Sequence, residues 1–136
     1  MKFVSTKNKI EVEAGEAIFS GTASDNGLFM PSVIPKIEPR EYNSFENFQQ
    51  FSNKMLSVFF NETVFEDDLN EIVSEALNFE VMQRDLSKDQ VLVSMLELFH
   101  GPTAAFKDFG ARFLASSMSK IIKKQANSKA ITILVA

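Results

Sequence analysis

The sequence has no cysteine, no tryptophan and a single histidine among its 136 residues. The lack of cysteine excludes a disulfide framework, a thiol nucleophile and a zinc site built from thiolates. One histidine also excludes a metal site made of several imidazoles, so we expect no metal. Glycine and proline are scarce, with 5 and 4 residues, and each place where they gather therefore points to a turn.

Positive charge is in short supply as well. The formal net charge is −4 and the pI is near 5.0, so there is no basic surface for nucleic acid; the lysine-rich stretch 120–129 is short and is expected to end a helix. Hydrophobic runs fall short of the ~20 residues of a membrane-spanning helix. The amino terminus lacks the pattern of a signal peptide. We expect a cytoplasmic protein that binds neither nucleic acid nor membranes.

Phenylalanine is abundant, with 14 residues. Apolar residues at helical spacing predict two amphipathic helices, the first capped by Ser44 and the second preceded by acidic residues that suit its amino-terminal dipole. The repeating residues are Phe45, Phe48, Phe51, Met55, Leu56, Phe59 and Phe60, and then Leu69, Ile72, Val73, Ala76 and Leu77. Such phenylalanines are usually core residues, and we interpret both helices as scaffold.

The amino-terminal segment is predicted to begin with a strand at Lys2–Ser5 and a short helix at 14–19 that Gly21 closes. Residues 24–40 contain one glycine and three prolines and are expected to form an ordered loop. Two interpretations stay open for residues 25–31 within it. They form a plain connection, or they close over an active site assembled elsewhere.

The carboxyl-terminal part predicts a strand at 91–98, a long helix from Phe106 to about Gln125 and a second strand at 130–136. A strand, helix and strand in this order form a crossover unit, which requires a parallel sheet. An apolar last strand without neighbours would invite aggregation. We therefore expect that the chain is the amino-terminal piece of a longer protein.

One lysine stands at the start of this long helix. It lies in the segment Phe99-His100-Gly101-Pro102-Thr103-Ala104-Ala105-Phe106-Lys107-Asp108-Phe109-Gly110. The helix dipole disfavours a positive charge at Lys107, and Phe99, Phe106 and Phe109 are expected to exclude water around it. Both effects favour a neutral, nucleophilic amine. Lys107 is thus the candidate catalytic residue.

Neighbouring polar residues allow several roles. His100 is either a second acid or base or a structural hydrogen-bonding group. Glu97 is either catalytic or, as we favour, a solvated residue or a partner of Arg112. Thr103 is expected to cap the helix, and Asp108 to complement its dipole and pair with Arg112.

The lysine segment closely resembles the pyridoxal-phosphate lysine motif of threonine synthases. A second stretch is similar to that family's amino-terminal turn, namely Ser24-Asp25-Asn26-Gly27-Leu28-Phe29-Met30-Pro31. Asn26 replaces a glycine of the family pattern, and asparagine tolerates the left-handed backbone better than most residues. Ala104 stands where the family more often has leucine, which changes packing and leaves the chemistry intact.

The resemblance implies an α/β fold, the amino-terminal part of a fold-type II pyridoxal-phosphate enzyme with helices packed on a partial parallel sheet. Residues 1–89 would be a helical region with a short leading strand, and residues 90–136 the start of the cofactor-binding domain. Lys107 would hold pyridoxal 5'-phosphate as a Schiff base. The parent enzyme would convert O-phospho-L-homoserine and water to L-threonine and phosphate, the last step of threonine biosynthesis.

Two alternatives remain beside this hypothesis. A related phospholyase would use the same cofactor and eliminate phosphate without making threonine, and a scaffold or interaction domain would use the lysine only structurally. Residues that hold the cofactor phosphate are expected beyond Ala136, since the five glycines are too dispersed to form a phosphate loop. The 136-residue chain alone is expected to be inactive and to need the rest of its own chain.

Overall fold

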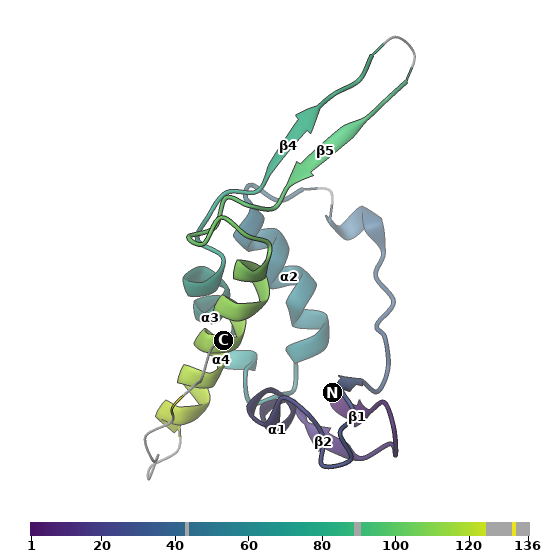
Figure 1. The fold of residues 1–136 in the computed structure, drawn as a ribbon, viewed down its shortest axis with the longest axis vertical. Coiled ribbons are helices and arrows are strands. Elements are labelled where there is room, and N and C mark those ends of the chain that lie inside the picture. Colours follow the sequence, from purple (N-terminus) through teal and green to yellow (C-terminus); the bar gives the residue numbers. More distant parts are fainter. Residues whose placement is uncertain (43, 89–90, 125–131, 133–136) are drawn as a thin grey trace.

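The computed structural model describes residues 1–42, 44–88, 91–124 and 132. They form a helical body with a small sheet at one end and a hairpin that projects from the other (Figure 1). The elements in chain order are β1 (Lys2–Ser5), β2 (Glu11–Glu13), α1 (Ala14–Ser20), β3 (Phe29–Pro31), η1 (Pro39–Tyr42), α2 (Phe48–Phe60), η2 (Glu66–Asp68), α3 (Leu69–Ala76), β4 (Met82–Asp85), β5 (Ser94–Glu97) and α4 (Lys107–Lys124).

The small sheet has the order β2-β1-β3, and both pairings are antiparallel. It confirms the strand predicted at Lys2–Ser5, and α1 confirms the helix that Gly21 closes, with φ of 69° at that glycine. The loop expected at 24–40 is wrong in part, because β3 lies within it. Pro31 is compatible with β3 because β3 is an edge strand, where a missing N–H costs no ladder hydrogen bond.

The core of the body lies where α2, α3 and α4 pack together, with α1 on one side. Ile72 is fully buried, and Phe60 and Phe65 meet edge to face in the same cluster. The prediction that phenylalanines at helical spacing serve the core is confirmed in part, since Phe60 is buried and Phe48 and Phe59 pack against the same cluster partly buried. The N-cap prediction is wrong: α2 is capped by Asn47, whose Oδ1 accepts a hydrogen bond from the N–H of Gln50 at 2.9 Å, and Ser44 lies outside the helix.

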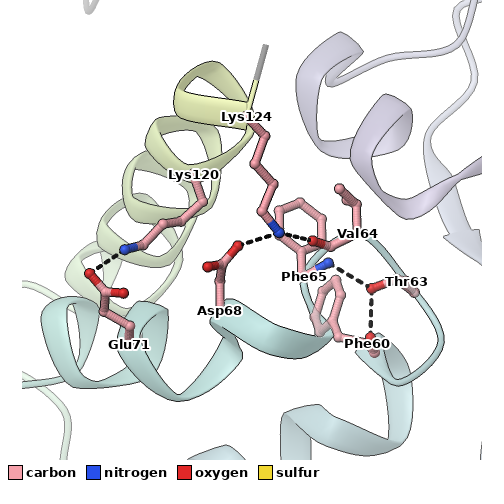
Figure 2. Close-up of polar contacts among 8 residues, drawn as sticks. All are labelled: Phe60, Thr63, Val64, Phe65, Asp68, Glu71, Lys120 and Lys124. Atoms are coloured by element: carbon pink, nitrogen blue, oxygen red, sulfur yellow. Dashed lines mark hydrogen bonds and ion pairs between the residues drawn. The ribbon is translucent and has the colours of Figure 1, made fainter. Parts of the chain in front are cut away.

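Ion pairs connect the carboxyl-terminal half of α4 to α3 and η2 (Figure 2). Buried Lys120 pairs with Glu71, and this hydrogen bond raises the pKa of Lys120 above its ordinary value despite burial. Lys124 Nζ lies 2.6 Å from Asp68 Oδ2 and donates to the Val64 carbonyl at 2.9 Å. The lysines expected to suit the helix dipole thus hold α4 against its neighbours.

The predicted strand at 91–98 is confirmed in part, as the shorter β5 (Ser94–Glu97), but its partner was not foreseen. β5 pairs antiparallel with β4 in a two-stranded hairpin, with Met82 opposite Glu97. The strand expected at 130–136 lies outside the described residues, apart from Thr132. The partial parallel sheet expected here is therefore not found among the described residues, because β5, the first strand of the expected crossover unit, pairs antiparallel with β4. This part of the chain is a mixture of helices and strands in which each strand pairing is antiparallel.

None of the helices in the described ranges has the length and hydrophobicity needed to cross a bilayer.

Candidate active site at the start of helix α4

Lys107 is the first residue of α4, as predicted, and a tight turn carries the chain to it from β5. The N–H of Ala104 donates to the Gly101 carbonyl at 2.9 Å, and the N–H of Asp108 donates to the Ala105 carbonyl at 3.2 Å. Ala104 has φ of 54°, in the left-handed region that side chains other than glycine rarely occupy. This backbone strain lies within the lysine segment, and sequence reasoning did not foresee it.

Asp108 stabilises the turn through hydrogen bonds. Its buried carboxylate accepts two hydrogen bonds at Oδ2, from the Thr103 N–H at 2.8 Å and the Thr103 hydroxyl at 2.9 Å. A Cβ on Gly101 would lie 2.4 Å from the same oxygen, so only glycine fits there. The expectation that Thr103 caps the helix through backbone contacts is wrong, since its hydroxyl binds Asp108.

Arg112 fixes the direction of α4 relative to α3. Its Nε donates to the Ala76 carbonyl at 2.7 Å, and one terminal nitrogen donates to the Glu75 carbonyl and to Asn78 Oδ1, each at 2.8 Å. Carbonyls at the end of a helix lack intrahelical partners, and Arg112 supplies donors for those of α3. The expected pairing of Arg112 with Asp108 or Glu97 is therefore wrong.

The Lys107 side chain is exposed beside an apolar surface of α4. It lines a shallow hollow of about 510 Å³ together with Phe106, Gly110, Ala111 and Leu114. Phe106 is 67% exposed and Phe99 is 52% exposed. The expectation that these rings exclude water is therefore wrong for the described chain: Phe109 packs inward against Phe48 and Phe79, and the other two rings leave the amine open to solvent.

Glu97 and His100 form the second polar group at this end of the molecule. Glu97 is only 9% exposed; its Oε2 lies 2.6 Å from His100 Nε2, and its Oε1 accepts a hydrogen bond from Arg84 Nε at 3.1 Å. The contact with His100, and then that with Arg84, hold the pKa of Glu97 below its ordinary value. The expectation of a solvated carboxylate is therefore wrong. Arg84 was missed, because its place depends on the hairpin register.

The second motif, at Asp25 to Pro31, lies away from Lys107. Asp25 accepts hydrogen bonds from the Asn8 N–H, the Ser5 hydroxyl and the Gly27 N–H, and these contacts lower its pKa. Asn26 has φ of 58°, which confirms the left-handed backbone expected there. Ser5 ends β1, and β1 lies at the end of the body opposite the hairpin (Figure 1). The described chain does not bring this turn over Lys107.

Comparisons with known proteins all point to one family. Residues 2–77 match the family model described as threonine synthase N terminus. The threonine synthase of Serratia marcescens is 37% identical over 139 aligned residues, which cover 100% of this chain and 31% of that protein. The threonine synthase of Escherichia coli K12 is 36% identical with the same two coverages. The chain thus spans about 31% of the length of these curated relatives.

Solved structures give the same result. The crystal structure of Escherichia coli threonine synthase aligns with a TM-score of 0.78 at 35% identity, covering 89% of this chain and 28% of that one. A pyridoxal-phosphate-bound threonine synthase from Brucella melitensis aligns with a TM-score of 0.75 at 27% identity, covering 91% of this chain and 28% of that one. By the family model and by these similarities, the chain belongs to the threonine synthase N-terminus family.

Proposed function

We propose that this chain supplies the lysine-bearing part of a threonine synthase, which converts O-phospho-L-homoserine and water to L-threonine and phosphate in the cytoplasm. The observation that carries the proposal is the placement of Lys107, exposed as the first residue of α4 beside an apolar hollow. Similarity to threonine synthases over 100% of the chain, and to a relative whose structure contains pyridoxal phosphate, supports it.

The residues at this end of α4 fit pyridoxal phosphate. A primary amine is the group that captures an aldehyde, and Lys107 presents one on a flexible stem. The hollow beside it is lined by Phe106, Ala111 and Leu114, which offer apolar surface to a planar ring. When bound, the cofactor supplies an electron sink for the substrate carbon that loses its proton.

Lys107 would serve both as the anchor of the cofactor and as the proton carrier of the reaction. Its Nζ, once released by the incoming substrate, would take up the proton from the substrate and return it to another carbon. The amine must be neutral to take up this proton and is then an ammonium when it returns it, and exclusion of water around the amine favours the neutral form. The described residues leave Lys107 exposed. We therefore assign the exclusion of water to residues of the same protein outside the described ranges.

The proposal includes a division of labour within a fold-type II enzyme. Residues 1–89 would be the supporting helical region and residues 90–136 the start of the cofactor-binding domain. Arg112 and Lys120 of α4 bind groups of α3, so the first region would set the orientation of the lysine-bearing helix. Residues that hold the cofactor phosphate and the substrate phosphate would belong to the remainder of the enzyme.

Trapping of the cofactor tests the proposal on the product of the natural gene. The protein is incubated with pyridoxal phosphate and then with borohydride, which fixes the cofactor to whichever amine holds it, and the labelled peptide is identified by mass spectrometry. We expect the label on Lys107. Lys107→Ala should abolish it, whereas Lys36→Ala, at a lysine whose side chain is 88% exposed, should leave it unchanged. A label that persists in Lys107→Ala contradicts the proposal and favours a structural role.

Product analysis separates threonine synthase from the phospholyase alternative. With O-phospho-L-homoserine as substrate, we expect L-threonine and phosphate in equal amounts. Release of phosphate without threonine would favour the phospholyase. The 136-residue chain by itself is expected to show no turnover and at most weak cofactor binding, because its lysine lacks cover. Sustained threonine production by this chain alone would contradict that expectation.

A further inference from the structure

The sequence contains a single Asn-Gly pair, at Asn26 and Gly27. Asparagine is a chemically labile residue, because the backbone nitrogen of the next residue can attack its side-chain amide. A following glycine favours this attack, since it has no Cβ to obstruct the approach and its backbone rotates freely. The structure places Asn26 on the exposed side of a turn, where water reaches the amide, and buries Gly27. The pair is therefore a candidate modification site.

The modification is deamidation. The Gly27 nitrogen gives up its proton to solvent and forms a bond to Asn26 Cγ, and the bond from Cγ to Nδ2 breaks as ammonia leaves with a proton from water. The product is a cyclic imide, the succinimide. Water then adds to either imide carbonyl, and the ring opens to aspartate or to isoaspartate. Water is the co-reactant, and the reaction needs no oxidant, metal or enzyme.

The folded turn holds the attacking nitrogen in place. The Gly27 N–H donates to Asp25 Oδ1 at 2.8 Å. The Gly27 carbonyl accepts from the Ala23 N–H at 2.9 Å, and the Asn26 N–H donates to the Ala23 carbonyl at 2.9 Å. A Cβ on Gly27 would overlap Ser5 Oγ, so this backbone is packed closely against the end of β1. Ring closure requires the Gly27 nitrogen to turn toward the Asn26 side chain, and these contacts oppose that rotation.

The Asp25 carboxylate also opposes the chemical step. It is fixed beside the nitrogen by the Ser5 hydroxyl and the Asn8 N–H, each at 2.8 Å. Attack by Gly27 requires its N–H to lose a proton, and a negative charge in contact with that group disfavours the resulting anion. The carboxylate is a poor base for removing the proton, because its hydrogen bonds lower the pKa of Asp25 below the ordinary value.

We propose that Asn26 is a deamidation site that the folded turn keeps unreacted through the contact between Asp25 and the Gly27 N–H. Conversion is then confined to chains whose turn has opened. An isoaspartate at position 26 adds a methylene group to the main chain, which displaces Gly27 from Ala23 and prevents the turn from closing as before. Unfolding thus leaves a permanent chemical mark in this turn. The inference is independent of the reaction proposed at Lys107.

Deamidation of the natural gene product in folded and unfolded form tests this proposal. The protein is kept in neutral buffer with or without guanidinium chloride and is then digested with trypsin. Trypsin releases residues 10–36, in which Asn26 is the only side-chain amide, so a gain in mass from NH2 to OH has one source. A synthetic peptide of residues 22–31 gives the unrestrained rate in each buffer.

We expect the folded protein to convert Asn26 at least roughly 10-fold more slowly than the peptide, the scale of one hydrogen bond to a charged acceptor. In guanidinium chloride, the protein and the peptide should react at the same rate. Equal rates for the folded protein and the peptide would overturn the proposal. Absence of conversion in guanidinium chloride would overturn it as well.

Two substitutions test the role of Asp25. Asp25→Ala removes the acceptor of the Gly27 N–H and should raise the rate in the folded protein roughly 10-fold, with no change in guanidinium chloride. Asp85→Ala is the matched control and should leave the rate unchanged, because Asp85 Oδ1 accepts from the Ser87 N–H at 2.8 Å in the same local arrangement away from this turn. Circular dichroism verifies that each variant is folded. A folded Asp25→Ala variant that reacts no faster than the unmodified protein would overturn the proposal.

Should Asp25→Ala fail to fold, Ser5→Ala takes its place. This change removes the hydroxyl that holds the Asp25 carboxylate and leaves the carboxylate itself. The rate in the folded variant should rise above that of the unmodified protein and stay below that of the peptide. An unchanged rate in folded Ser5→Ala would again overturn the proposal.

Discussion

The two ends of helix α4 lie in opposite environments. Its second half contributes Ser117 and Ile121 to the interior, and Lys120 there is buried and paired with Glu71. Its first half presents Lys107, Ala111 and Leu114 to solvent beside an apolar hollow. One helix therefore carries a stabilising end and an end that we propose is the reactive one. The difference indicates that packing of the second half fixes the helix while Lys107 in the first half stays exposed.

The largest expected effect tests the stabilising end. Ile72 is 0% exposed beneath α4, and Ile72→Ala should lower the free energy of unfolding by about 3 kcal/mol, through lost burial and the cavity left behind. Ile34 is 77% exposed, and Ile34→Ala should change the free energy of unfolding by less than about 0.5 kcal/mol. Urea unfolding of both variants makes the measurement. Equal losses would contradict the assignment of the core.

Alanine substitutions at two glycines compare the turn before Lys107 with the helix after it. Gly101→Ala places a methyl group against Asp108 and should destabilise the chain by about 2 kcal/mol. Within the described part of the chain, no atom lies within 4 Å of the position that a Cβ on Gly110 would occupy, so Gly110→Ala should stabilise by up to about 1 kcal/mol through helix propensity. Thermal unfolding measures the change in stability of each variant. Changes of the same sign in both variants would contradict this description of the turn and the helix.

The stabilising end of α4 contains a buried hydroxyl group. Ser117 Oγ is buried and has no hydrogen-bond partner among the described residues. Ser117→Ala should raise the free energy of unfolding by about 1 kcal/mol, since it removes a desolvated polar group. Ser119→Ala, on the same helix, controls for helix propensity and should gain only about 0.5 kcal/mol. Destabilisation by Ser117→Ala would point to a hydrogen bond that the hydroxyl makes in solution.

The smallest expected effect is a pH dependence that both ends share. The Ser116 hydroxyl donates to Glu75 Oε2 at 2.6 Å and, together with Lys120 and Lys123, holds the pKa of Glu75 below its ordinary 4.5. A depressed carboxyl pKa stabilises the fold above the ordinary value, and this contribution is lost as the pH falls through 4.5 toward the lower folded-state pKa. Glu97 behaves likewise at the reactive end.

Stability measured against pH checks this expectation. Glu75→Gln and Glu97→Gln should each flatten the fall in stability below pH 4.5, the ordinary value of both carboxyls. Glu80→Gln, at an exposed glutamate, should leave the curve as it is. An unchanged acid limb in the first two variants would mean that these contacts are not kept in solution.

The sequence predicted the long elements well because their apolar period encodes the buried face directly. Helices α2, α3 and α4 were foreseen from Phe, Leu and Ile spacing, and the order β5, turn and α4 placed Lys107 correctly. The strands β2, β3 and β4 were missed. They have three or four residues each, and their existence depends on a partner strand that local spacing does not specify.

The surroundings of the candidate site were harder to predict for the same reason. Asp108 was assigned to the dipole, and Arg112 to Asp108 four residues away or to Glu97, since sequence reasoning favours partners that lie near in the chain. Their real partners come from the turn before the helix and from α3. Arg84 reaches Glu97 only because the hairpin register brings the two strands together.

The bonds from Arg112 to the last carbonyls of α3 bear on how the chain folds during synthesis. Helix α3 leaves the ribosome first, and water occupies those carbonyls until the arginine emerges 36 residues after Ala76. We expect the lysine-bearing helix to dock late, onto an end already formed. Ribosome-stalled chains of increasing length would show α3 protected from hydrogen exchange first, and α4 protected only once Arg112 has cleared the exit tunnel.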